Sequence, residues 1–231
     1  MTDLRDIYNR HADRYQVLVS REDHQHNILP ALNRITPLAG LDVIELGAGT
    51  GRLTTMLVPV VGTIQAFDAS QPMLDVAIAR LEQSPLHNWS VDVADHRSLP
   101  VEDGVADLVI SGWSIVYMVV WNEKSWRVEL GKALAEMRRV LRTGGTIVVL
   151  ETMGTGYETP HPPDELAEYY AFLDGEGFCS TWIRTDYKFE SLDEAETLTR
   201  FFFGEELAEK IIRENCVVLP ECTGIWWWRN E

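Results

Sequence analysis

The sequence predicts an α/β fold with a mostly parallel sheet covered on both faces by helices. Short runs of Val, Ile and Leu alternate with segments of helical periodicity over residues 40–150. These apolar runs are nearly unbroken, which is typical of strands buried on both faces. With 231 residues, 45% of them hydrophobic, the chain can form one well-buried domain and a small helical cap.

The first half begins with one or two helices over residues 3–36, where Ile28, Leu32 and Ile35 recur at helical spacing. Ser70 is expected to cap another helix, with Pro72 in its first turn. The strands expected here are Leu41–Leu46, Thr63–Phe67, Trp89–Val93 and Ala106–Ser111, with a helix over Thr50–Val60.

The second half continues with a helix over Trp126–Leu141, because Leu130, Leu134 and Met137 share one face. Gly144-Gly145 ends it before a strand over Thr146–Leu150. Further on we expect a helix over Asp164–Leu173, a strand over Trp182–Phe189, helices over about 191–214 and a last strand over Gly224–Arg229.

Composition excludes several classes of function. The net charge of −16 disfavours nucleic acid as a partner, since phosphate binding needs clustered Lys and Arg. The N-terminus lacks the apolar core of a signal peptide, and the most apolar run, residues 109–120, is too short to span a membrane. Cys179, Cys216 and Cys222 show no CxxC spacing, so we expect reduced thiols, no metal site and a cytoplasmic location without a membrane partner.

The residues that follow the first expected strand carry the strongest functional signal. Glu45 is the last residue but one of this strand, and Gly47, Gly49 and Gly51 follow at alternate positions. Glycine permits positive φ and lets a ligand approach the backbone closely. The next helix offers free N–H groups, which suit a carboxylate or phosphate. A purely structural tight turn is the alternative interpretation.

The glycine spacing limits which nucleotide can bind. The dinucleotide pattern G-x-G-x-x-G fails because Arg52 occupies its third glycine position, and no Lys-Ser/Thr follows to make a phosphate-binding Walker loop. Asp68 ends the second strand about 20 residues later, where an acid can accept hydrogen bonds from both ribose hydroxyls. A helix-capping role for Asp68 is the alternative.

An ordered set of motifs over about residues 40–150 resembles the class I S-adenosylmethionine-dependent methyltransferases, most closely the small-molecule branch of the ubiquinone/menaquinone type. The motifs are Glu45-Leu46-Gly47-Ala48-Gly49-Thr50-Gly51, Phe67-Asp68-Ala69-Ser70, Asp95 ahead of Pro100, Asp107-Leu108-Val109-Ile110-Ser111 and Leu141-Arg142-Thr143-Gly144-Gly145. Glu45 stands where many members carry Asp.

The resemblance implies a Rossmann-like, doubly wound, mostly parallel seven-stranded sheet with an antiparallel last strand and a helical cap. It further implies one domain over 1–231. Residues 1–36 would form an N-terminal helical cap and residues 40–150 the cofactor-binding core. Residues 151–231 would complete the sheet, with a cap insertion at about 191–214.

The resemblance also assigns roles to individual residues in binding S-adenosylmethionine, with S-adenosylhomocysteine as product. Asp68 would bind the ribose and Asp95 the adenine amino group, while the His96 backbone N–H meets a ring nitrogen. The His96 side chain is expected to be solvated or structural. The full expected cofactor set is Tyr15, Glu45, Gly47, Ala48, Gly49, Gly51, Asp68, Ala69, Met73, Asp95, His96, Ser111 and Gly112.

The acceptor would be a small molecule, methylated by in-line displacement, and no catalytic base is identifiable. Tyr8, His11 and Tyr15 recur at roughly helical spacing near the N-terminus, where an N-terminal helix closes over the cofactor in similar enzymes. Trp113 and Tyr117 follow the fourth strand at the expected substrate entrance. Ordinary packing is the alternative for these aromatic residues. His161, in its proline-flanked loop, is a further candidate substrate residue, as a base near the acceptor, and plain exposure is the alternative for it.

Two other functions compete with methyl transfer. A nicotinamide-dependent oxidoreductase on a similar fold is disfavoured by Arg52. A non-catalytic S-adenosylmethionine-binding regulatory protein stays open because no base is evident. The atom that receives the methyl group (N, O, C or S) stays open as well, as does a homodimer.

Overall fold

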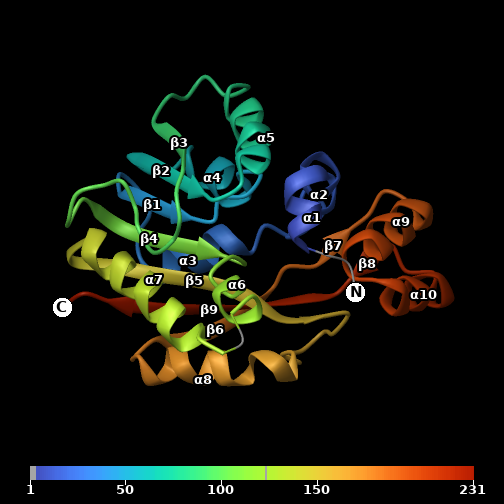
Figure 1. Cartoon of the computed structure of the whole chain (residues 1–231). Helices are drawn as coiled ribbons and strands as arrows, with labels where there is room; N and C mark the ends of the chain where they lie inside the picture. Colours follow the sequence, from blue (N-terminus) through green and yellow to red (C-terminus); the bar gives the residue numbers. More distant parts are fainter. Residues whose placement is uncertain (1–3, 123) are drawn as a thin grey trace.

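The computed structural model describes residues 4–122 and 124–231, and a seven-stranded sheet runs through it (Figure 1). The strand order is β3-β2-β1-β4-β5-β9-β6. β9 pairs antiparallel with both β5 and β6, while the other pairs are parallel. The strands are β1 Asp42–Leu46, β2 Thr63–Asp68, β3 Trp89–Val93, β4 Ala106–Gly112, β5 Leu141–Thr155, β6 Cys179–Arg184 and β9 Glu221–Arg229. The predicted fold class is confirmed.

Helices cover both faces of the sheet, because neighbouring strand residues point to opposite sides. Val43 packs in a cluster with α3 and α4, whereas Ile44 packs in a second cluster with α7 and α8. The helices are α1 Leu4–Arg10, α2 Ala12–Val19, α3 Ile28–Ile35, α4 Arg52–Leu57, α5 Gln71–Leu81, α6 Tyr117–Val120, α7 Trp126–Val140, α8 Ala167–Gly175, α9 Leu192–Phe202 and α10 Glu205–Glu214, with a 3₁₀ turn η1 at Asp164–Leu166. None of the helices in the described residues has the length and apolar character needed to cross a membrane.

A cap formed by α9, α10 and the two-stranded sheet of β7 (Tyr187–Lys188) and β8 (Val218–Leu219) lies beside the N-terminal helices (Figure 1). Leu18 of α2 is fully buried in one cluster with Leu198 of α9 and Ile211 of α10. The N-terminal helix α2 therefore packs against the helices α9 and α10 of the cap, next to the sheet.

Two expectations about local structure are wrong. Of the segment 3–36 the structure describes residues 4–36, which contain three helices rather than one or two. The strand expected over Trp182–Phe189 is two strands in different sheets, because the Asp186 carboxylate accepts from the backbone N–H of Glu221 and turns the chain away after β6. Ser70 does occupy the N-cap position of α5, with Pro72 in the first turn, but its hydroxyl donates to the carbonyl of Tyr8 and makes no capping hydrogen bond.

Candidate active site

The glycine loop connects β1 to α4 with three left-handed residues. Gly47, Gly49 and Gly51 have φ of 71°, 54° and 76°. A Cβ on Gly47 would lie 1.7 Å from Ser114 Oγ, so a larger residue cannot fit without moving the loop that follows β4. Glycine at this position therefore lets two loops approach each other at the carboxyl ends of β1 and β4.

Asp68 organises the loop at the end of β2. Its Oδ2 accepts from the Gly49 N–H and its Oδ1 from the Ser70 N–H, both at 2.8 Å. One carboxylate thus holds the glycine loop and the start of α5 in fixed positions. Its oxygens keep further lone pairs that a ligand can use.

Glu45 is buried at the end of β1, with 2% of its surface exposed. The Thr54 hydroxyl donates to Glu45 Oε2 at 2.7 Å. Burial raises the pKa of Glu45 to about 7, although the Thr54 hydrogen bond opposes the shift. The carboxyl lines the same cavity as Asp68, where a cationic group of a ligand would favour its ionised form.

Asp95 and His96 follow β3 and differ in environment. Arg97 pairs with Asp95 at 2.6 Å and holds the pKa of that carboxyl at about 2. His96 is buried, with Nε2 3.2 Å from Ser114 Oγ, and burial lowers its pKa. The imidazole is therefore neutral near pH 7, and its side chain is structural rather than solvated.

Aromatic residues of α1, α2 and α6 cover the cavity. The hydroxyls of Tyr8 and Tyr117 are hydrogen bonded to each other, and the Tyr8 ring meets the Tyr15 ring edge-on at 5.4 Å. Tyr117 also stacks on Trp121 at 4.6 Å. The N-terminal helices are thus joined to the loop after β4 across the opening of the cavity.

Most of the predicted site residues line this single cavity. They are Tyr8, Tyr15, Glu45, Gly47, Ala48, Gly49, Asp68, Ala69, Met73, Asp95, His96, Gly112, Trp113 and Tyr117. Gly51, Ser111 and His11 are not among its lining residues. Gly51 adjoins Ala77 of α5, Ser111 is buried in β4, and His11 lies 3.6 Å from Asp6 with its ring against Phe201.

Residues 43–145 match a family model described as a methyltransferase domain. This part of the chain is therefore a methyltransferase domain. The chain is 32% identical over 111 residues to the uncharacterized protein YafE of Escherichia coli, covering 48% of this chain and 49% of that protein. It is 29% identical over 147 residues to demethylmenaquinone methyltransferase of Lactococcus lactis, covering 61% of this chain and 53% of that protein. The chain thus matches about half the length of these curated relatives.

Among solved structures, phosphoethanolamine N-methyltransferase 2 of Haemonchus contortus, in complex with S-adenosyl-L-methionine, superposes with a TM-score of 0.63 and 16% identity. The match covers 100% of this chain and 61% of that one. At this level of identity the likeness supports the fold of the methyltransferase domain, and the chemistry must be argued from the residues.

A second cavity adjoins the first beside the methyltransferase domain. The two cavities share Tyr15, Arg52, Trp113 and Tyr117 as lining residues. His161, a predicted substrate residue, lines the second cavity only, where its ring stacks on Tyr157 at 4.1 Å. Ligands in the two cavities would therefore meet between these shared side chains.

Arg52 lies between the two cavities, and the sequence pattern had marked it only as a failed glycine position. Its Nη1 lies 2.6 Å from Glu22 Oε2, and its guanidinium stacks 3.7 Å above the Trp113 ring. Both members of this ion pair are largely buried. No local signal pairs Arg52 with Glu22, because the contact depends on how the segment after α2 packs against the sheet.

Glu151 was also missed, although a signal existed for it. It lies in β5 opposite the end of β4, the same sheet edge that supplied Glu45 and Asp68. The Tyr169 hydroxyl donates to its Oε1 at 3.1 Å, and burial raises its pKa to about 8. Glu221 reaches this edge for another reason: β9 is antiparallel, so its first residue lies where the parallel strands end.

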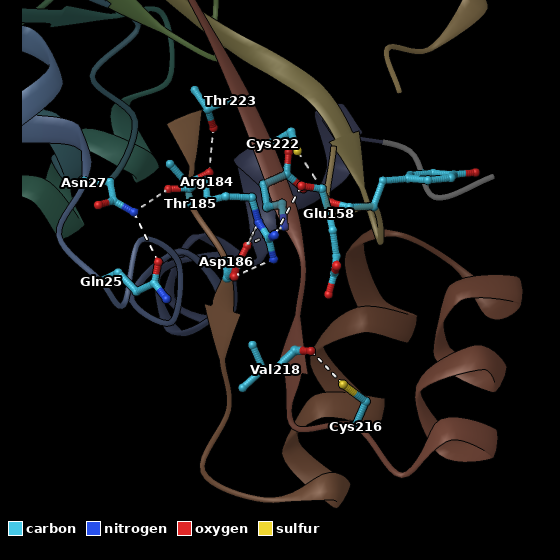
Figure 2. Close-up of polar contacts among 12 residues, drawn as sticks. Gln25, Asn27, Glu158, Arg184, Thr185, Asp186, Cys216, Val218, Cys222 and Thr223 are labelled. Carbon is cyan, nitrogen blue, oxygen red and sulfur yellow. Dashed lines mark hydrogen bonds and ion pairs between the residues drawn. The ribbon is translucent and has the colours of Figure 1, made fainter. Parts of the chain in front are cut away.

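A polar network fixes the wall that carries Glu221 and Tyr157. Figure 2 shows Arg184 paired with Asp186. Their closest atoms lie 2.7 Å apart, and Asp186 Oδ1 also accepts from the Glu221 N–H. Arg184 also donates to the carbonyl of Glu158, and the Cys222 thiol lies 3.5 Å from the Tyr157 carbonyl oxygen. These contacts tie the loop after β5 to the start of β9, so the second cavity has a defined wall.

Proposed function

We propose that the chain binds S-adenosylmethionine and transfers its methyl group to a small-molecule acceptor. One observation carries this proposal: Glu45, the glycine loop and Asp68 line one cavity at the carboxyl ends of β1 and β2. Open parallel sheets bind ligands at this edge. The methyltransferase relatives support the same conclusion.

The chemistry of the lining residues fits an adenosyl cofactor. Asp68 is oriented by two backbone N–H groups and can accept from a ribose diol. Glu45 suits the ammonium of a methionine group, and the space beside Gly47 and Gly49 admits a ligand against the backbone. Met73 lines the cavity near Gly49, where it can pack on a planar ring.

We assign Asp95 and the His96 backbone N–H to the adenine, as the family pattern implies. The Arg97 pair keeps Asp95 ionised over the physiological pH range, so its carboxylate can accept from an amino group. Ser111 and Gly51 would act indirectly, by shaping the end of β4 and the start of α4.

When bound, the cofactor supplies a methyl group activated by a sulfonium. The task of the chain is then to align donor and acceptor and to exclude water. Tyr15, Trp113 and Tyr117 are placed for this, since they line both cavities. The bonded Tyr8–Tyr117 pair holds α1 over the donor side. Because the N-terminal helices, the sheet and the cap all contribute residues to the second cavity, we propose that residues 1–231 act as one domain.

Titration calorimetry with S-adenosylhomocysteine and with NAD tests the cofactor. We expect binding of S-adenosylhomocysteine, and preferential binding of NAD would favour the oxidoreductase instead. Arg52, which pairs with Glu22, stands where the dinucleotide-binding pattern G-x-G-x-x-G has its third glycine, and this argues against NAD. An acceptor screen that measures release of S-adenosylhomocysteine then separates an enzyme from a regulatory protein that binds the cofactor without turnover.

A further inference from the structure

The second cavity has an unusual balance of charge. Its volume is about 580 Å³, which is the size of a small-molecule site. Its lining includes four acidic residues, Glu22, Glu151, Glu165 and Glu221, against one arginine, Arg52, and one histidine, His161. A ligand in this cavity therefore meets an excess of carboxyl groups.

Two of these carboxyl groups have unused hydrogen-bonding capacity. Within the described part of the chain, buried atoms Glu22 Oε1 and Glu221 Oε2 have no hydrogen-bond partner. Their other oxygens are engaged, Glu22 by Arg52 and Glu221 by the Thr152 hydroxyl at 2.8 Å. Buried polar atoms in folded proteins are normally satisfied, so both oxygens are poised for a donor that arrives with a ligand.

The single arginine is largely committed. Arg52 forms its ion pair with Glu22 and stacks over Trp113. An anionic ligand would have to compete with Glu22 for this guanidinium while facing the remaining acids. Electrostatics therefore disfavours a carboxylate or phosphate group at this end of the cavity.

Aromatic rings form much of the remaining wall. Tyr157, Tyr187, Phe202 and Phe203 line the cavity in addition to the shared aromatic residues. Aromatic faces attract cations, and the attraction grows when water is excluded. Rings together with carboxylates form a suitable environment for an ammonium group.

We infer that the methyl acceptor is a small molecule carrying a protonated amine, whose ammonium group is held by Glu22 and Glu221. This inference rests on the proposed function, because it takes the second cavity as the acceptor site. Burial, followed by the charge of Glu22, raises the pKa of Glu221 to about 8. Arg52 opposes this shift in part, and an ammonium group beside Glu221 would further favour its ionised form.

The test compares matched probes that differ in one group. Phenethylamine, 2-phenylethanol and 3-phenylpropionate form one set, and hexylamine, 1-hexanol and hexanoate form another. Binding is measured by calorimetry on the full chain, with and without saturating S-adenosylhomocysteine. We expect at least one amine to bind about tenfold or more tightly than its alcohol, with the acid weakest, since the charge contact is desolvated.

Two variants locate the contact. Glu221→Gln keeps an acceptor for Thr152 but removes the charge, so the amine should bind about tenfold more weakly while S-adenosylhomocysteine affinity stays the same. Glu209→Gln, at an exposed position on α10, is the matched control and should change neither affinity. The unchanged cofactor affinity also shows that the Glu221→Gln protein is folded.

Separate measurements keep the two proposals distinguishable. If the unmodified chain does not bind S-adenosylhomocysteine, the proposed function is refuted. The amine titration without cofactor would still measure whether the second cavity binds an ammonium group. If the amines show no preference over alcohols and acids, or if Glu221→Gln leaves amine affinity unchanged, the ammonium site is refuted.

Discussion

Replacing Asp68 by alanine removes the one carboxylate that joins β2, the glycine loop and the start of α5. Two hydrogen bonds are lost, from the Gly49 and Ser70 N–H groups, each 2.8 Å long. Hydrogen bonds to charged groups are each worth more than neutral ones, but Asp68 is only half-buried, which reduces the effect. We expect Asp68→Ala to lower the free energy of unfolding by about 2 kcal/mol.

Asp68→Ala should also weaken cofactor binding. If the Asp68 carboxylate also accepts from the ribose, its removal weakens binding by about 1–3 kcal/mol, or roughly 5- to 150-fold. Calorimetry with S-adenosylhomocysteine measures the affinity, and urea unfolding measures the stability. Asp75→Ala is the control, because Asp75 lies exposed on α5 and accepts from the Gln71 side chain, so its loss should change either quantity by no more than about 0.5 kcal/mol.

Deoxy analogues separate direct contact from loop disorder. The unmodified chain should bind 2′- or 3′-deoxy S-adenosylhomocysteine more weakly than the parent ligand, whereas Asp68→Ala should lose this discrimination. Asp68 has no role in ribose recognition if the folded variant binds S-adenosylhomocysteine within about twofold of the unmodified chain, or if it still distinguishes the analogues.

Three further predictions concern stability. Gly47→Ala should lower the free energy of unfolding by about 2–4 kcal/mol, because the new Cβ would overlap the Ser114 side chain and the backbone has a positive φ. The control Gly131→Ala, in open space on α7, should raise the free energy of unfolding by up to about 1 kcal/mol. Similar urea midpoints for the two variants would contradict this prediction. The folded-state pKa of Glu45, about 7, lies above its ordinary value of 4.5, so the stability it contributes is full below pH 4.5 and lost as pH rises through 7. Between pH 4.5 and 7 the unmodified chain should therefore lose about 3 kcal/mol of unfolding free energy that the Glu45→Gln variant does not lose. If the unfolding free energies of the two proteins change in parallel with pH, the raised pKa of Glu45 is refuted. Arg52→Met should lower the free energy of unfolding by about 3–5 kcal/mol, because it leaves Glu22 buried without its ion-pair partner. The double variant Arg52→Met/Glu22→Gln should recover much of that loss. If the effects of the two substitutions on the free energy of unfolding simply add, the pair is not coupled.

Much of the fold could be predicted because its signals are local. The strands β1 to β4 are short segments rich in Val, Ile and other apolar residues, and their predicted bounds agree with the structure to within a residue or two. Glu45 and Asp68 could be predicted to meet because parallel strands end at one sheet edge. The strand over 182–189 was wrong because a side-chain contact between Asp186 and the backbone of Glu221 breaks it, which strand propensity does not contain.

The sequence by itself determined the α/β class, the glycine loop and the carboxylates that follow β1, β2 and β3, since each depends on residues close in the chain. Only the tertiary structure decided that Arg52 pairs with Glu22 and that Glu221 lies beside them. These contacts join the segment after α2, the start of α4 and the first residue of antiparallel β9. The second cavity, and with it the acceptor chemistry, is set by how distant segments pack, because each of its walls comes from a different part of the chain.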